Sequence, residues 1–263
     1  MTTTPTSPAP IALVAHDDGR FVELRLTRPP RNVLDGAALA ALADAAATLR
    51  GADHRHARAI LLTADGPSFS VGASVPEHGR AQAAGMLAGF HAAIRALADV
   101  DLPIVAGLRG HCLGGGLELA LLAARIYAHP ATQLGQPEIR LGAIAPVASL
   151  LLPARIGQAA AEDLLTSGRA VDGSAALALG LVTELADAPE AAAAAWIRAA
   201  LVPHSASSIR LATRAARAGL RRSLAAPLTA LERLYVDELS PTHDAEEGVR
   251  AFLDKRAPRW EDR

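Results

Sequence analysis

The sequence has few of the side chains that would suggest an extracellular, membrane-bound or nucleic-acid-binding protein. Cys112 is the only cysteine, which excludes an internal disulfide and fits a reducing cytoplasm. The formal net charge is −1, and no basic stretch is interleaved with aromatic residues, so nothing favours a surface for nucleic acid or for a membrane. The apolar runs are broken by charge, glycine or proline before they reach membrane-spanning length.

Several catalytic and metal-binding patterns are also missing. No His-x-x-x-His pair or Cys/His cluster suggests a metal, and lone histidines such as His91 and His111 are more often packed or solvated. No Gly-x-Ser-x-Gly supports a serine hydrolase. The glycines at 114–116 lack a following Lys-Ser/Thr and the Rossmann spacing, so a nucleotide-phosphate or NAD site has weak support. Residues 1–10 lack the charged start and apolar core of a signal peptide, and we expect a disordered tail there.

What is present predicts an α/β fold. The chain has 263 residues and is 51% hydrophobic, enough for one large domain with a sizeable core. We expect a β-hairpin at 11–26, helices at 34–49 and 81–100, and buried strands at 59–63 and 103–108. This repeated strand–helix order predicts a mainly parallel sheet wrapped by helices. The expected core spans 11–200. A helical region over 201–263 is expected to pack outward or onto a neighbouring chain.

A glycine run and two glutamates are the strongest candidates for chemistry. Glycines at 114–116 allow a tight strand-to-helix turn and also let a ligand approach the main chain closely. The first N–H groups of the following helix have no internal partner, so they can stabilise an oxyanion. Glu118 follows inside this helix among apolar neighbours, and Glu138 follows on a loop. An anion hole flanked by two carboxylates is suited to proton transfers at carbon next to a thioester carbonyl.

Seven short motifs occur in order along the chain. They are Arg28-Pro29 with Asn32; Phe69-x-x-Gly72-Ala73; Gly114-Gly115-Gly116-x-Glu118-Leu119-Ala120; Gly135-Gln136-Pro137-Glu138-Ile139-x-Leu141-Gly142; Leu165-Thr166-x-Gly168-Arg169; Ala178-x-Gly180-Leu181-Val182; and Asp244-x-x-Glu247-Gly248-x-x-Ala251-Phe252-x-x-Lys255-Arg256. Together they resemble the crotonase (enoyl-CoA hydratase/isomerase) superfamily from about Leu13 to Arg263. The resemblance implies a repeated ββα spiral core with a helical C-terminal oligomerisation region.

The resemblance also implies roles for particular residues. The backbone N–H groups of Ala73 and Gly115 would form an oxyanion hole for the carbonyl of a CoA thioester. Glu118 and Glu138 align with the two glutamates of water-adding members, where one carboxyl removes a proton from water and the other assists and returns a proton to carbon. Which glutamate does which stays open. Substrate contacts are expected from Arg31, Val33, Val71, Ser74, Glu77, His78 and Pro146.

Two C-terminal residues are implied to contact CoA across a subunit boundary. Phe252 and Lys255 are expected to reach the nucleotide bound to an adjacent subunit. An ordinary basic helix end, favoured by the helix dipole, explains Lys255 equally well.

Within the family, three stretches are most similar to members that hydrate a cyclic dienoyl-CoA; these are residues 68–78, 136–149 and 161–165. The implied reaction is 1,4-addition of water to cyclohexa-1,5-diene-1-carbonyl-CoA, which gives 6-hydroxycyclohex-1-ene-1-carbonyl-CoA in anaerobic aromatic (benzoyl-CoA) degradation.

Two departures from the common family pattern bear on the choice of substrate. Ser74 replaces an acidic residue. Pro146, which has no N–H, lies where hydratases have a glycine-rich turn that helps to place water. We therefore expect water to be held differently here, and a bulkier or cyclic acyl group to fit better.

Two other functions stay open. One is a related CoA-ester reaction, either ordinary enoyl-CoA hydration or double-bond isomerisation, although an isomerase needs only one base. The other is a non-catalytic member that binds RNA or a protein partner, against which the near-neutral charge counts. We expect no metal, and no cofactor apart from the CoA of the substrate. We also expect no nucleic-acid or membrane partner, and a cytoplasmic homotrimer or homohexamer.

Overall fold

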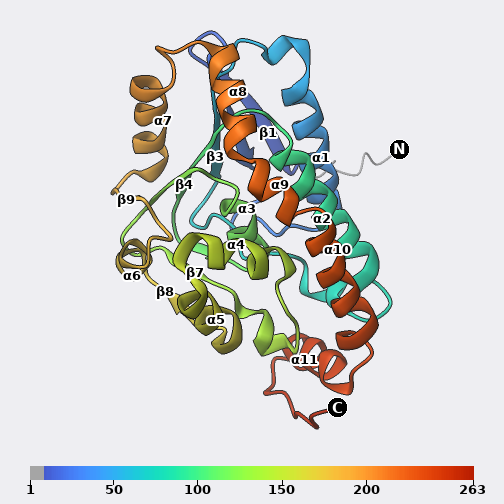
Figure 1. Ribbon diagram of the computed structural model, residues 1–263. Coiled ribbons are helices and arrows are strands. Elements are labelled where there is room, and N and C mark those ends of the chain that lie inside the picture. The colour runs from blue at the N-terminus through green and yellow to red at the C-terminus, as the bar shows by residue number, and fades with distance from the viewer. Residues whose placement is uncertain (1–8) are drawn as a thin grey trace, which may run out of the picture.

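A six-stranded sheet runs through the middle of the protein (Figure 1) in the computed structural model, which describes residues 9–263. Its strands, in spatial order, are β1 (Ile11–His16), β2 (Phe21–Leu26), β3 (Ile60–Ala64), β4 (Ile104–Leu108), β6 (Arg125–Ala128) and β9 (Glu184–Leu185). β1 pairs with β2 in antiparallel fashion, and all later pairs are parallel. The predicted hairpin and mainly parallel sheet are confirmed. Residues 1–8 of the predicted tail lie outside the described part.

Helices follow the strands in sequence. They are α1 (Gly36–Arg50), α2 (Ala83–Ala98), α3 (Gly115–Ala120), α4 (Pro146–Ile156), α5 (Gln158–Ser167), α6 (Gly173–Ala178), α7 (Pro189–Ala200), α8 (Ala206–Ala216), α9 (Ala218–Ser223), α10 (Ala226–Arg233) and α11 (His243–Leu253). A π-helical turn, Leu234–Leu239, continues directly from α10. The Asp35 carboxylate caps α1 by accepting a hydrogen bond from the Ala38 N–H, as its position before the apolar run predicted.

The strands are apolar on both sides because helices cover both faces of the sheet. Successive side chains of a strand point to opposite faces. Ile60 and Leu62 belong to the main core together with residues of α1 and α2, whereas Leu61 between them packs in a second cluster with Ile197 of α7. This double coverage explains why β3 and β4 read as continuous apolar runs rather than as alternating ones.

A second, three-stranded sheet positions the glycine run and Glu138. Its strands are β5 (His111–Leu113), β7 (Gln133–Gly135) and β8 (Ala170–Val171), in the order β5-β7-β8. β5 and β7 are parallel, with Leu113 opposite Gly135. The 3₁₀ turn η3 (Pro137–Leu141), which carries Glu138, begins two residues after β7. Because both strands end at the same edge, the glycine run after β5 and the glutamate after β7 emerge side by side.

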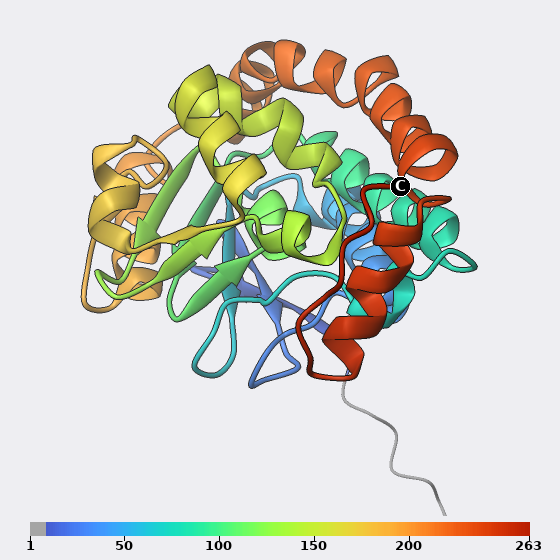
Figure 2. The same ribbon diagram turned by 90° about the horizontal axis from the view of Figure 1, so that it is seen from below.

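Pro146 begins α4, at the first helical position, where a missing N–H costs nothing. One expectation about the C-terminal region needs correction. The C-terminal helices do not pack outward, because Leu224 and Leu228 are part of the main core. Helices α8 to α10 form an arc across the helices of the core, and α11 packs against η3 and against η2 (Val75–His78) (Figures 1 and 2).

The packing of α11 against η3 yields a stability prediction. A Cβ on Gly248 of α11 would lie 2.2 Å from the Leu141 carbonyl oxygen. We expect Gly248→Ala to lower the melting temperature, since forced overpacking costs about 1–3 kcal/mol. Alanine's better helix propensity returns only about 1 kcal/mol. Thermal unfolding followed by circular dichroism measures the difference.

The matched control is Gly219→Ala in α9, where the nearest atom to the added Cβ is Arg222 Nη2 at 4.0 Å. That variant should be as stable as the parent or more stable, because only the gain in helix propensity remains. Equal melting temperatures for Gly248→Ala and the parent would contradict the close contact between α11 and η3.

Candidate active site

A cavity of about 700 Å³ lies between the glycine run, η2, η3 and α11. The structure brings eight of the predicted site residues to its wall: Arg31, Val33, Val71, Ala73, Ser74, His78, Glu138 and Phe252. They come from the loop before α1, the segment before η2, η2 itself, η3 and α11. Residues far apart in sequence therefore meet at one cavity.

The predicted oxyanion hole is built from two backbone segments that run side by side. The Ser70 N–H donates to the His111 carbonyl at 2.9 Å, and the Leu113 N–H donates to the Ser70 carbonyl at 3.0 Å. A Cβ on Gly115 would lie 3.3 Å from the Ala73 nitrogen, so the two predicted amides are close together. Within residues 9–263 neither of these two N–H groups donates to another backbone carbonyl. Both remain available to a carbonyl oxygen in the cavity.

The approach of the two segments requires glycine at two positions. Gly72 has a φ of +97°, and a Cβ there would lie 2.9 Å from the Leu113 carbonyl oxygen. Gly114 has a φ of +53°, and its Cβ would lie 2.6 Å from Glu138 Oε1. Positive φ and this lack of space both exclude an ordinary side chain. The Glu138 carboxylate therefore lies directly against the backbone of the glycine turn.

Glu118 is held by the beginning of another helix. Its side chain is 5% exposed, and its Oε1 accepts a hydrogen bond of 2.8 Å from the Ala148 N–H at the start of α4. Burial raises the pKa of the Glu118 carboxyl, an effect that the N–H groups of Ala148 and Val147 reduce. The first N–H groups of a helix lack internal partners and carry the positive end of its dipole, so they suit a carboxylate.

Glu138 is held by a side chain that the sequence reasoning missed. Gln136 is 1% exposed, and with its amide nitrogen turned toward Glu138 it donates to Oε2 at 3.0 Å and to Oε1 at 3.1 Å. Burial, and then the charge on Glu118, raise the pKa of the Glu138 carboxyl. The charge of Glu118 therefore reaches Glu138, so the two carboxyls are near each other. Glu118 also donates its N–H to the carbonyl of Gly114, the glycine against which Glu138 lies.

This arrangement can move protons at carbon beside a polarised carbonyl. Two carboxyls with raised pKa values can exchange the roles of acid and base near neutral pH. Two free N–H groups can stabilise the enolate that forms when a nucleophile adds to an unsaturated thioester, and losing one such donor typically costs about 3–4 kcal/mol. His78 at the wall is a neutral ring, because burial lowers its pKa, and its Nδ1 lies 2.9 Å from the Ser74 carbonyl oxygen.

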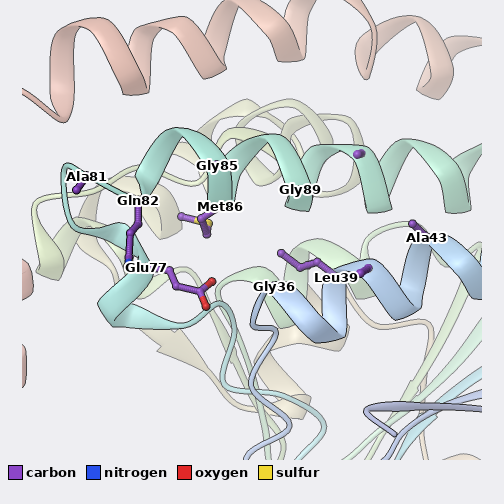
Figure 3. Close-up of a pocket in the computed structure, with 11 residues that line it drawn as sticks. Gly36, Leu39, Ala43, Glu77, Ala81, Gln82, Gly85, Met86 and Gly89 are labelled. Carbon is purple, nitrogen blue, oxygen red and sulfur yellow. The ribbon is translucent and has the colours of Figure 1, made fainter.

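Glu77 was predicted to contact the substrate, but the structure does not bring it to this cavity. It lines a separate groove of about 610 Å³ between α1 and α2, with Met86 and Leu39 (Figure 3). The reason is local: η2 is a 3₁₀ turn, in which neighbouring side chains point about 120° apart. His78 therefore faces the cavity while Glu77 faces the groove.

Pro146 and Lys255 are also absent from the cavity wall. Pro146 is buried at the start of α4, and the segment that follows still supplies N–H groups, to Glu118. These N–H groups are bound to a carboxylate, and the expectation that water is held differently from the common family pattern stays a prediction. Phe252 is 54% exposed and lines the cavity of its own chain, where the prediction had it reach a neighbour. Lys255, just beyond the end of α11, is exposed.

Other cavity residues were missed because their position depends on the tertiary path of the chain. Arg256 and Pro258 reach the wall only because α11 returns to η3, which no local pattern indicates. Arg140, which also lines the cavity, belongs to the same motif as Glu138 and could have been found from it. Within residues 9–263 no group of His, Cys, Asp and Glu side chains could hold a metal ion. In the same part of the chain, no helix has the length and apolar character needed to span a membrane.

Comparison with known proteins gives a consistent result. The sequence pattern of the family described as enoyl-CoA hydratase/isomerase matches residues 18–263. The cyclohexa-1,5-dienecarbonyl-CoA hydratase of Thauera aromatica is 47% identical over 258 residues, which cover 97% of this chain and 98% of that protein. A probable enoyl-CoA hydratase of Rhizobium meliloti (strain 1021) is 33% identical over 256 residues, which cover 95% of this chain and 98% of that protein.

Solved structures agree on the fold. The crystal structure of an enoyl-CoA hydratase/isomerase from Pseudoalteromonas atlantica T6c superposes with a TM-score of 0.79 at 27% identity, over 95% of this chain and 99% of that one. The predicted fold class, an α/β core with a helical C-terminal region, is confirmed.

The raised pKa of Glu138 predicts how stability changes with pH. Above the ordinary glutamate pKa of about 4.3 the unfolded chain loses this proton while the folded chain keeps it, so stability falls as pH rises toward the raised pKa. Glu138→Gln removes the titrating carboxyl and with it this loss of stability at high pH. We expect its melting temperature to exceed that of the parent at about pH 8.5 and to approach it at about pH 4.

Glu162→Gln on α5 is the matched control, since Glu162 is an exposed carboxylate. Its melting temperature should follow that of the parent at every pH. A Glu138→Gln variant that gained nothing at alkaline pH would show that the Glu138 carboxyl is not desolvated.

Proposed function

The chain belongs to the enoyl-CoA hydratase/isomerase family, and on that premise we propose that it adds water to cyclohexa-1,5-diene-1-carbonyl-CoA. The product is 6-hydroxycyclohex-1-ene-1-carbonyl-CoA. The observation that carries this proposal is one cluster of groups at the cavity: Glu138 lies at its wall against the glycine turn, the free amides of Ala73 and Gly115 lie close together there, and the charge of Glu118 reaches Glu138. The 47% identity to the Thauera aromatica hydratase supports the cyclic substrate.

The oxyanion hole determines which ring carbon water attacks. Hydrogen bonds from Ala73 and Gly115 to the thioester carbonyl draw electrons from the conjugated C1=C2 bond, so C2 becomes the electrophilic carbon. Water loses a proton to one carboxylate, and its oxygen bonds to C2. The C1=C2 electron pair moves into a dienolate whose negative oxygen is held by the two amides. The C5=C6 pair then takes a proton at C5, and the new double bond joins C1 and C6.

Glu118 and Glu138 divide the two proton transfers between them. One must be ionised to accept the proton of water, and the other must be protonated to deliver a proton to carbon. Their shared site favours this mixed state, because the charge on Glu118 raises the pKa of Glu138. After a turnover the two protonation states are exchanged, and a proton exchange with solvent restores them.

The cavity also supplies groups for the rest of the substrate. Arg31 and Arg140 line the cavity, and their exposed guanidinium groups suit the phosphates of CoA. We propose that no cofactor is needed beyond the CoA of the substrate, since hydration is redox-neutral and these residues supply acid, base and oxyanion stabilisation. Hydration of a linear enoyl-CoA is the second candidate. It is retained because the segment after Pro146 still supplies N–H groups, which donate to Glu118.

We further propose that the chain acts as a homotrimer or homohexamer in the cytoplasm. Apolar side chains on the C-terminal helices support an assembly, since Leu211 is 61% exposed and Leu234 is 39% exposed. Burying such side chains between subunits would stabilise it.

Deuterium labelling tests the reaction and its regiochemistry together. Turnover of the cyclic dienoyl-CoA in D₂O should place one deuterium on product carbon 3, which is C5 of the substrate. Simple addition across C5=C6 would instead place it on product carbon 5. Nuclear magnetic resonance of the hydrolysed product distinguishes the two.

We also expect kcat/KM for the cyclic dienoyl-CoA to exceed that for crotonyl-CoA by at least about 100-fold, or roughly 3 kcal/mol in transition-state binding. Comparable values for the two substrates would favour the second candidate.

Removing either carboxyl should stop the reaction. Glu118→Gln and Glu138→Gln are each expected to lower kcat by about 10²–10⁴-fold, because each removes one proton transfer from the transition state. KM should change much less, since neither change removes the groups that hold CoA. The double variant should be little worse than either single one, because the two carboxyls act as a unit. Full activity in either variant would exclude a mechanism that uses two carboxyls. Glu162→Gln is the control and should keep the activity of the parent.

A further inference from the structure

Tyr235 lies directly behind two residues of the active-site wall, although its sequence position gives no hint of it. It is 3% exposed and belongs to a small apolar cluster with Ala83, Met86 and Leu87 of α2 and with Ala143. Ala73 and Leu141, which both line the cavity, pack against the same cluster. The ring therefore packs behind the oxyanion loop and η3, on the side of the cavity where the thioester carbonyl and the acyl group would lie.

The hydroxyl of Tyr235 has no partner in the protein. Within residues 9–263, the fully enclosed side-chain atoms without a hydrogen bond are Arg28 Nε, His91 Nε2 and Arg210 Nε. The Tyr235 hydroxyl oxygen also makes no hydrogen bond, but it is not one of these fully enclosed atoms. It is therefore slightly accessible to solvent or to a ligand. Burial, and then the charge on Glu138, raise the pKa of this phenol, so the hydroxyl remains a hydrogen-bond donor in the working pH range.

The backbone around Tyr235 is built to hold this side chain in place. Tyr235 lies in the π-helical turn 234–239, where the Ser240 N–H donates to the Tyr235 carbonyl at 2.8 Å. Such wide turns often occur at functional sites. Just before this turn, Glu232 accepts a hydrogen bond of 2.7 Å from Nδ1 of the fully buried His91 in α2. This contact fixes the end of α10 to α2, and so fixes the place of Tyr235.

We infer that Tyr235 is a positioning residue of the hydratase site: its ring closes the acyl end of the cavity, and its hydroxyl donates a hydrogen bond, directly or through the reacting water, to Glu138. This inference rests on the proposed function and adds to it a group from the C-terminal region. A closed end leaves room for a compact ring and excludes a long straight chain. A donor near Glu138 stabilises the ionised carboxylate relative to the protonated acid.

Tyr235→Phe removes the hydroxyl and keeps the ring. We expect kcat for the cyclic dienoyl-CoA to fall about 5–50-fold with KM nearly unchanged. The limb of the kcat–pH profile that reports Glu138 should move up by about half to one pH unit, because its carboxylate loses a hydrogen bond. The matched control is Tyr127→Phe in β6, which is also 3% exposed and whose hydroxyl accepts a hydrogen bond from Arg125 Nε. It should leave kcat and the pH profile unchanged.

Tyr235→Leu tests the ring. Shortening the wall should raise kcat/KM for a straight-chain 2-octenoyl-CoA relative to the cyclic dienoyl-CoA by about 10-fold or more, the effect of a few methylene groups in an apolar pocket. Tyr235→Phe should keep the parent's preference. The inference is overturned when Tyr235→Phe has the parent's kcat and pH profile, or when Tyr235→Leu has the parent's acyl preference. Turnover of the cyclic substrate by the unchanged enzyme separates these outcomes from a failure of the proposed function.

Discussion

The close approach of two backbone segments at Gly72 and Gly114 is the constraint on which the site depends. Neither position has space for a Cβ, and both have positive φ. This contact puts the amides of Ala73 and Gly115 beside each other and presses the Glu138 carboxylate against the same turn. The parallel pairing of β5 and β7 supplies the frame, because it delivers the glycine run and η3 to one edge. An oxyanion hole of main-chain amides needs this rigidity, since its donors must be in place before charge develops.

The buried Glu118 carboxyl and the half-buried Glu138 carboxyl are held by separate groups. Glu118 takes its hydrogen bond from the start of α4, and Glu138 takes its hydrogen bonds from the Gln136 amide. Neither anchor is a cation, so neither stabilises the ionised form as strongly as an arginine would. Burial therefore keeps both pKa values raised. A site of this kind gives up some stability at alkaline pH in exchange for carboxyls that can act as acid and base near neutrality.

The core of the fold and the centre of the site could be predicted from sequence because they depend on local patterns. Apolar strands, the Asp35 cap and the glycine run each specify backbone geometry over a few residues. Sequence reasoning gave no indication of Tyr235, whose position depends on the path of distant segments. It expected Phe252 to reach an adjacent subunit, whereas Phe252 lines the cavity of its own chain. The sequence marked Pro146 as a departure from the family pattern but did not show that it begins a helix, whose next amides hold Glu118. Glu77 was misplaced by a single step along a 3₁₀ turn.

Independent anchoring of the two carboxyls also bears on the chemistry of a ring. In ordinary enoyl-CoA hydration, oxygen and proton go to adjacent carbons. In 1,4-addition to the cyclic diene they go to carbons on opposite sides of the ring, so the proton-accepting and proton-donating groups must reach different points. Glu118 is held from the start of α4 and Glu138 lies on η3, so the two carboxyls approach the site from different elements of the fold. Carboxyls on separate elements suit a reaction in which oxygen and proton go to distant carbons, and the way the acyl end of the cavity holds the ring then decides which carbon meets which carboxyl.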